Sequence, residues 1–155
     1  MGTYQDLVVG YRFETATRLL DDELLQELIG LGGYTHPLFV NPEFAERSPL
    51  GRTPFPGQAL LLIMGGLVEQ SGKFDETTIA LVGFDGVRFR GPAFAGDEIR
   101  VLVTVVTKEV SSGGSRGVVV FGWEAQNARA ETIVEAKARM LFDLRNRDSQ
   151  EFPGR

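Results

Sequence analysis

The feature that most constrains this chain is a segment, Gly57 to Gln70, that is apolar almost all round. A helix without a polar face must be enclosed by the rest of the fold, because it has no side to present to water. Two adjacent glycines, Gly65 and Gly66, lie in its interior. Together they lower helix propensity by roughly 1–2 kcal/mol. We therefore expect an enclosed helix whose glycine pair permits close approach of a sheet or of a partner subunit.

Beyond residue 77 the hydrophobic pattern changes from helical to alternating. Apolar and polar residues alternate over residues 79–90, 99–106, 118–125 and 134–142, which is typical of half-buried strands. The first of these is interrupted by Asp85-Gly86, so we expect a break there. Short turns between the later segments predict an antiparallel meander. One sheet wrapped around the apolar helix is the simplest way to cover that helix, and this arrangement is an α+β fold.

The segments before the apolar helix are shorter and more polar. Residues 8–19 are expected to be extended, and a capped helix is expected from Asp21 or Asp22 to about Leu31, ended by glycines. We expect a loop over residues 34–40. Asn41 then caps a second, short helix, Pro42–Arg47.

Length and composition predict one domain without disulfide bonds. The 155 residues fit a single domain, which we place at residues 1–143, followed by a polar tail, residues 144–155. The chain has no cysteine, which excludes disulfides and thiolate nucleophiles. It has one histidine, His36, so any histidine-dependent catalysis must use that residue. No metal site is expected.

The net charge and the search for targeting signals limit the expected partners and cellular location. The net charge of −5 disfavours nucleic acid and an anionic membrane surface as partners. The N-terminus lacks the basic and apolar regions of a signal peptide, and the longest apolar run, residues 59–68, is too short to span a bilayer. We expect a cytoplasmic protein that binds a small ligand.

Three segments, in order, resemble the MaoC-like family of (R)-specific enoyl-thioester hydratases and dehydratases. Residues 33–45, GYTHPLFVNPEFA, resemble the hydratase loop of that family, usually G-D-x-N-P-L-H-x-D-P-x-x-A. Residues 55–58, FPGQ, stand where the family has His-Gly at the start of its central helix. Residues 87–97, VRFRGPAFAGD, resemble its R-F-x-x-P-V-x-x-G-D segment. The resemblance covers residues 8–142 and implies a single hotdog domain.

The catalytic pair of that family is not matched. Aligned on Pro37-Leu38, Tyr34 occupies the position of the catalytic aspartate and Phe39 that of the catalytic histidine, while His36 falls on the asparagine position. A phenylalanine cannot move a proton, and a tyrosine, with an ordinary pKa of about 10, is a poor base at neutral pH. Tyr34 and His36 are the candidate catalytic residues that remain.

The thioester-binding half of the site is matched better. In the family, a backbone N–H at the start of the central helix is directed at the thioester carbonyl, and Gly57 stands at that position. The resemblance implies that substrate is bound by four residues: Phe39, Phe55, Pro56 and Gly57. It implies no separate cofactor, since coenzyme A or phosphopantetheine is part of the substrate.

Three functions are consistent with these residues. The first is an atypical hydratase or dehydratase that uses Tyr34 and His36. The second is a non-catalytic subunit that pairs with an intact homologue, as a homodimer or heterodimer of hotdog proteins. The third is a hotdog thioesterase that uses Glu69, at the far end of the apolar helix, or a water held by His36.

Overall fold

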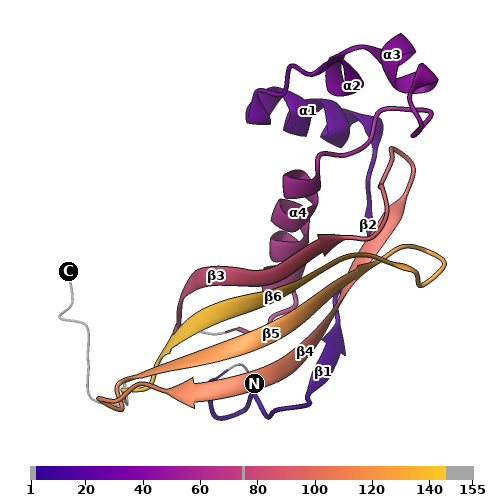
Figure 1. Cartoon of the computed structure of the whole chain (residues 1–155). Helices are drawn as coiled ribbons and strands as arrows, with labels where there is room; N and C mark the ends of the chain where they lie inside the picture. The colour runs from indigo at the N-terminus through magenta and orange to yellow at the C-terminus, as the bar shows by residue number, and fades with distance from the viewer. Residues whose placement is uncertain (1–2, 75, 146–155) are drawn as a thin grey trace, which may run out of the picture.

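The computed structural model describes residues 3–74 and 76–145. Within these residues, six strands and four helices follow one another; their arrangement is drawn in Figure 1. In order they are β1 (Arg12–Glu14), β2 (Arg18–Leu19), α1 (Asp22–Gly32), α2 (Pro37–Val40), α3 (Pro42–Arg47), α4 (Gly57–Gln70), β3 (Thr78–Phe89), β4 (Glu98–Val110), β5 (Arg116–Gln126) and β6 (Thr132–Asp143).

The strands form one antiparallel sheet in the order β1-β4-β5-β6-β3, with β2 pairing with β4 beside this path. The strand β3 pairs with β6 and therefore lies at an edge of the sheet. The long strands curve past α4, while α1, α2 and α3 stand together at one end of the molecule (Figure 1). The antiparallel meander and the α+β class predicted from the alternating pattern are confirmed.

The core lies between α4 and the concave face of the sheet. The helix contributes Leu60, Ile63, Met64 and Leu67, each at most 5% exposed. Their spacing puts them on one side of a helix, and burying each one stabilises the fold by roughly 1.5–3 kcal/mol. The inward positions of β4, β5 and β6 complete the core with Ile99, Val101, Val103, Val105, Val119, Phe121, Trp123, Ala125, Val134, Ala138 and Phe142. No helix within the described residues has the length and apolarity needed to cross a membrane.

The expectation that α4 is enclosed on all sides is only half met. Leu62 is 67% exposed, and Leu61, Gly65 and Gly66 are partly exposed. The curved sheet covers only the side of the helix that carries the core residues. The opposite side borders a cavity, so the apolar pattern reflects two different surroundings.

Glycines and local hydrogen bonds account for two further differences. The expected break at Asp85-Gly86 is absent, because β3 runs through it with a shift of register, and Gly86 takes a positive φ of 58° there. The loop expected over residues 34–40 contains the short helix α2, which starts at Pro37 and is capped by His36. The predicted helices α1, α3 and α4 are confirmed, including the caps Asp21, Gly33 and Asn41.

The extended segment expected over residues 8–19 is divided into β1 and β2. Both pair with β4, and between them Thr15 binds that strand through both backbone and side chain. Its N–H donates to the Val101 carbonyl at 3.0 Å, and its hydroxyl accepts from the Val101 N–H at 2.9 Å. The side chain thus replaces one rung of the ladder, and the strand is interrupted there.

The sheet ends with an ion pair at the proposed domain boundary. The Arg145 guanidinium donates to both carboxylate oxygens of the buried Asp143, at 2.9 and 2.7 Å. These hydrogen bonds hold the pKa of the Asp143 carboxyl well below its usual range. Leu144 packs against the core, so ordered contacts continue past residue 143. The rest of the predicted tail, residues 146–155, lies outside the described residues.

The fold does not require a glycine at position 66, and an alanine substitution tests this. A Cβ at Gly66 would have no neighbour within 4 Å, and the same holds for Gly30 on α1. We expect Gly66→Ala and Gly30→Ala each to raise the free energy of unfolding by about 1 kcal/mol, because alanine is the better helix former. Urea denaturation measures both. A loss of stability confined to Gly66→Ala would mean that another chain packs closely on that face.

Candidate functional site

The site starts where α4 begins, at a point fixed by the neighbouring turn. The Phe55 N–H donates to the Ala93 carbonyl at 2.8 Å, and Pro54 forms a bridge with Phe94. Pro56, which is fully buried, is the N-cap and offers no side-chain hydrogen bond. The first amides of the helix therefore lack a cap from the side chain before them, and they carry the partial positive charge of a helix N-terminus.

A groove of about 680 Å³ opens at this end of α4. Its walls come from α2, from the loop before α4, from the first turns of α4, and from the end of β3 with the turn that follows. The lining residues are Phe39, Leu50, Pro54, Phe55, Gly57, Gln58, Leu60, Leu61, Val87, Phe89, Gly91, Pro92 and Ala93. None of them has an ionisable side chain. The groove suits an apolar ligand with a polar atom directed at the helix start.

Gly57 and Phe89 approach each other closely across this groove. A Cβ on Gly57 would lie 2.9 Å from the ring of Phe89, so any larger residue would push the ring away. Phe89 is 50% exposed. The absence of a side chain at Gly57 thus leaves the first amides of α4 accessible beside an aromatic wall.

Tyr34 reaches this groove indirectly. Its backbone N–H donates to the Ile29 carbonyl at 3.1 Å, which ties it to the end of α1. Its ring packs edge-on against Phe39, with 5.0 Å between the ring centroids. Its hydroxyl donates to Oε1 of Gln58 at 3.1 Å. Both partners line the groove, so Tyr34 orients two of its walls.

His36 is the N-cap of α2 in the same loop. Its Nδ1 accepts a hydrogen bond from the Leu38 N–H at 3.1 Å and so caps α2. Its ring lies edge-on to Phe44, with 5.9 Å between centroids. His36 is not among the residues that line the groove.

The structure therefore brings together only some of the predicted site residues. Phe39, Phe55 and Gly57 line one groove, Tyr34 contacts it through its neighbours, and Pro56 is buried behind it. The catalytic roles of Tyr34 and His36 stay predictions. Gln58 and Phe89 were not among the site residues predicted from the sequence. Two signals could have indicated them: Gln58 directly follows Gly57, and Phe89 is an aromatic residue within the matched 87–97 motif.

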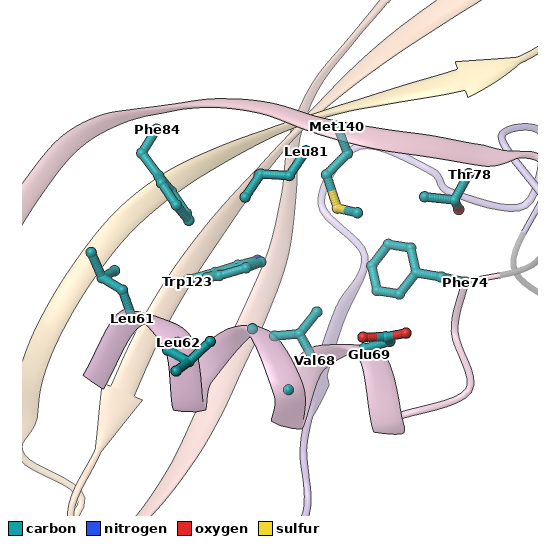
Figure 2. A pocket seen from close by; sticks show the side chains of 12 residues that line it. Leu61, Leu62, Val68, Glu69, Phe74, Thr78, Leu81, Phe84, Trp123 and Met140 are labelled. Carbon is teal, nitrogen blue, oxygen red and sulfur yellow. The ribbon is translucent and has the colours of Figure 1, made fainter. Parts of the chain in front are cut away.

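A second cavity of about 650 Å³ runs along the exposed side of α4 (Figure 2). Leu61, Leu62, Val68 and Glu69 line it from the helix. The opposite wall comes from β3, β5 and β6 and from the loop after α4; its residues are Phe74, Thr78, Leu81, Phe84, Trp123 and Met140. Leu61 lines both cavities, so the two are neighbours on α4.

A comparison with protein-family models gives a match over residues 29–124, to the MaoC-like domain. The match includes the hydratase-like loop, α4, β3, β4 and β5 as far as Glu124. The chain belongs to the MaoC-like domain family. The groove of this MaoC-like domain lies where the matched loop, the start of α4 and the matched 87–97 motif meet.

Solved structures of MaoC-like proteins share the fold. A monoamine oxidase regulatory protein from Archaeoglobus is 28% identical with a TM-score of 0.84, over 91% of this chain and 94% of that one. A MaoC-like dehydratase from Rhodospirillum rubrum is 24% identical with a TM-score of 0.83, over 92% and 97%. The HadBC (3R-hydroxyacyl-ACP dehydratase) complex from Mycobacterium tuberculosis is 17% identical with a TM-score of 0.74, over 86% and 96%. The fold is the hotdog domain that the sequence resemblance implied.

The link between Tyr34 and Gln58 is open to a direct test. Tyr34→Phe and Gln58→Leu each remove one partner of a solvent-exposed hydrogen bond. We expect a double-mutant cycle to give a coupling free energy of about 0.5–1 kcal/mol, in the range of an ordinary net hydrogen bond. Urea denaturation of the four proteins measures it. Additive effects of the two changes would contradict the orienting role of Tyr34.

Proposed function

We propose that this chain binds an acyl thioester in the groove at the start of α4, with the thioester carbonyl directed at the amides of Gly57 and Gln58. The observation that carries this proposal is the uncapped helix start in an apolar groove. Backbone N–H groups and the helix dipole favour the partial negative charge of a carbonyl oxygen. Membership of a hydratase and dehydratase family supports a 2-enoyl or 3-hydroxyacyl thioester of coenzyme A or of a carrier protein.

We further propose that the chain acts mainly as a binding subunit. Hydration of an enoyl thioester requires a group that removes a proton from water and a group that delivers a proton to carbon. The groove-lining residues of this chain offer neither. A related hotdog protein that retains an aspartate and a histidine would supply both.

The edge strand β3 favours such a partner. Three of its apolar residues, Ile79, Leu81 and Val82, are 42–54% exposed, and its outer side is unpaired within the described part of the chain. A long apolar edge invites addition of a strand from another chain. Support also comes from similar folds that are described as complexes: HadBC and ChsH1-ChsH2 of Mycobacterium tuberculosis.

The thioesterase alternative is less favoured by the geometry. Glu69 lies twelve residues after Gly57 on α4, which places it about 18 Å away along the helix axis. A carboxylate at that distance does not reach a carbonyl held at Gly57. A water held by His36 is also disfavoured, because His36 does not line the groove.

The proposal that this chain is mainly a binding subunit is tested by restoring the catalytic residues of the family pattern. The variant Tyr34→Asp with Phe39→His and His36→Asn places the missing pair in the matched loop. We expect the natural chain to hydrate crotonyl-coenzyme A at close to the background rate, and the variant to exceed it by roughly 100-fold or more, as general acid–base catalysis commonly does. The loss of absorbance of the enoyl thioester measures the rate.

Two controls complete that assay. His36→Ala in the otherwise natural chain tests whether any residual turnover depends on histidine. Isothermal titration with crotonyl-coenzyme A shows whether each variant still binds. Substantial turnover by the natural chain that His36→Ala abolishes would replace the binding-subunit proposal by the atypical enzyme.

Pairing is tested at the exposed edge. We expect Val82→Lys to shift the chain from dimer to monomer in light scattering, because a charge at an edge strand opposes strand addition. Val110→Lys is the matched control, since Val110 is similarly exposed, 57% against 54%, at the end of β4. A natural chain that is monomeric both alone and mixed with an intact homologue would contradict the pairing.

A further inference from the structure

Gln58 has the only polar side chain among the described residues that line the groove at the start of α4. In an apolar site, a few placed polar groups fix the orientation of the ligand and provide specificity, while the apolar walls mainly exclude water. Gln58 is exposed, so a ligand in the groove can reach it. What this one side chain offers therefore decides which polar atom the ligand must carry.

The hydrogen bond from Tyr34 gives the Gln58 side chain a direction. A glutamine amide has an oxygen that accepts hydrogen bonds and a nitrogen whose two N–H groups donate them. The Tyr34 hydroxyl donates to Oε1 of Gln58 at 3.1 Å. The Nε2 atom of Gln58 has no acceptor within the described part of the chain. Gln58 thus has an occupied accepting end and a free donating end.

The fold makes room for the Tyr34 ring at the end of α1. A Cβ at Gly32 would overlap that ring, although Gly32 has no positive φ that would call for a glycine. The Tyr34 N–H donates to the Ile29 carbonyl, and the ring packs edge-on against Phe39. A tyrosine restrained in this way keeps its hydroxyl on Oε1 and opposes a turn of the Gln58 amide that would exchange its two ends.

Two backbone donors lie next to this side chain. The N–H groups of Gly57 and Gln58 have no acceptor among the described residues, whereas those of Ala59 and Leu60 donate to the Pro56 carbonyl at 3.0 and 3.3 Å. The backbone N–H and the side-chain N–H groups of Gln58 are joined only by the short side chain of that residue. A ligand with two neighbouring acceptor oxygens can therefore bind both.

A 3-oxoacyl thioester has such a pair of oxygens, one on the thioester carbon and one on C3, and both only accept. A saturated or 2-enoyl thioester has only the first. A 3-hydroxyl group also brings a hydrogen that needs an acceptor. The one side-chain acceptor among the described lining residues is Oε1 of Gln58, to which Tyr34 already donates.

We propose that Gln58, oriented by Tyr34, makes this groove selective for 3-oxoacyl thioesters over saturated and 3-hydroxyacyl thioesters. This inference rests on the proposed function, since the thioester carbonyl at the start of α4 brings C3 beside Gln58. Tyr34 is here a positioning residue that acts through Gln58. The keto form of a 3-oxoacyl thioester has no double bond to hydrate and no hydroxyl to eliminate. Its selective binding suits a subunit whose groove lacks proton-transfer side chains.

The test compares three coenzyme A thioesters with four-carbon acyl groups by isothermal titration with the full chain: acetoacetyl, (3R)-3-hydroxybutanoyl and butanoyl. We expect acetoacetyl-coenzyme A to bind about threefold to tenfold more tightly than butanoyl-coenzyme A, the contribution of one net hydrogen bond. Gln58→Glu keeps the shape of the side chain but replaces its donor by an acceptor. It should make the 3-hydroxy ligand bind more tightly than the 3-oxo ligand. Gln26→Glu, on exposed α1, adds the same charge outside the groove and should leave the natural order unchanged.

A second arm tests the positioning by Tyr34. Tyr34→Phe removes the hydroxyl, and Gly32→Ala displaces the ring; each should reduce the preference for acetoacetyl- over butanoyl-coenzyme A to about twofold or less. Gly30→Ala is the matched control, because a Cβ there meets nothing within 4 Å. A purely structural role of Tyr34 would weaken all three ligands alike and leave their ratio unchanged. Circular dichroism checks that each variant is folded.

The outcomes separate this inference from the proposed function. If the three ligands bind the natural chain equally well, the selectivity is overturned and the groove stands as a thioester site. If acetoacetyl-coenzyme A is preferred but Gln58→Glu leaves that preference intact, the 3-oxo group is recognised elsewhere and the inference is wrong. If no thioester binds at all, the proposed function falls and the inference with it.

Discussion

The packing of α4 against the concave face of the sheet is the interaction on which the rest of the structure depends. One side of the helix buries Leu60, Ile63, Met64 and Leu67 against the inward residues of β4, β5 and β6. The start of the helix is held by the neighbouring turn, because the Phe55 N–H donates to the Ala93 carbonyl and Pro56 is buried. The uncapped amides of Gly57 and Gln58 are thus held in place by a backbone hydrogen bond and a buried proline directly before them. A rigid helix start is what a carbonyl-binding site requires, since preorganised donors need no rearrangement when the ligand arrives.

The same packing leaves the other side of α4 uncovered, and the second cavity runs along it. A helix that only had to stabilise the fold would carry polar residues on that side and alanine in place of the glycine pair. The chain instead keeps Leu61, Leu62, Gly65 and Gly66 beside an apolar edge strand. Helix stability is thus reduced where space and apolar surface are retained.

The hydratase-like loop keeps its place in the family fold although several of its residues differ from the pattern that it resembles. His36 caps α2, Asn41 caps α3, and Tyr34 packs against Phe39 and bonds to Gln58. These are local hydrogen bonds and ring contacts that hold the loop against the start of α4. They do not place an ionisable side chain among the residues that line the groove. In a fold whose edge strand is open to a second chain, binding and proton transfer can be divided between two protomers.

Local patterns in the sequence determined most of the fold. Capping residues marked the starts of α1 and α3, glycine marked the end of α1, and alternation marked the long strands, because these signals act over a few residues. The matched motifs determined the family and pointed to Gly57. Only the tertiary structure decided that α4 is covered on one side, that β3 continues through Asp85-Gly86, and that Phe89 and Gln58 join Gly57 and Phe39 in one groove. Those features depend on how the sheet curves and which surfaces it reaches, and curvature is set by long-range packing that no short stretch of sequence contains.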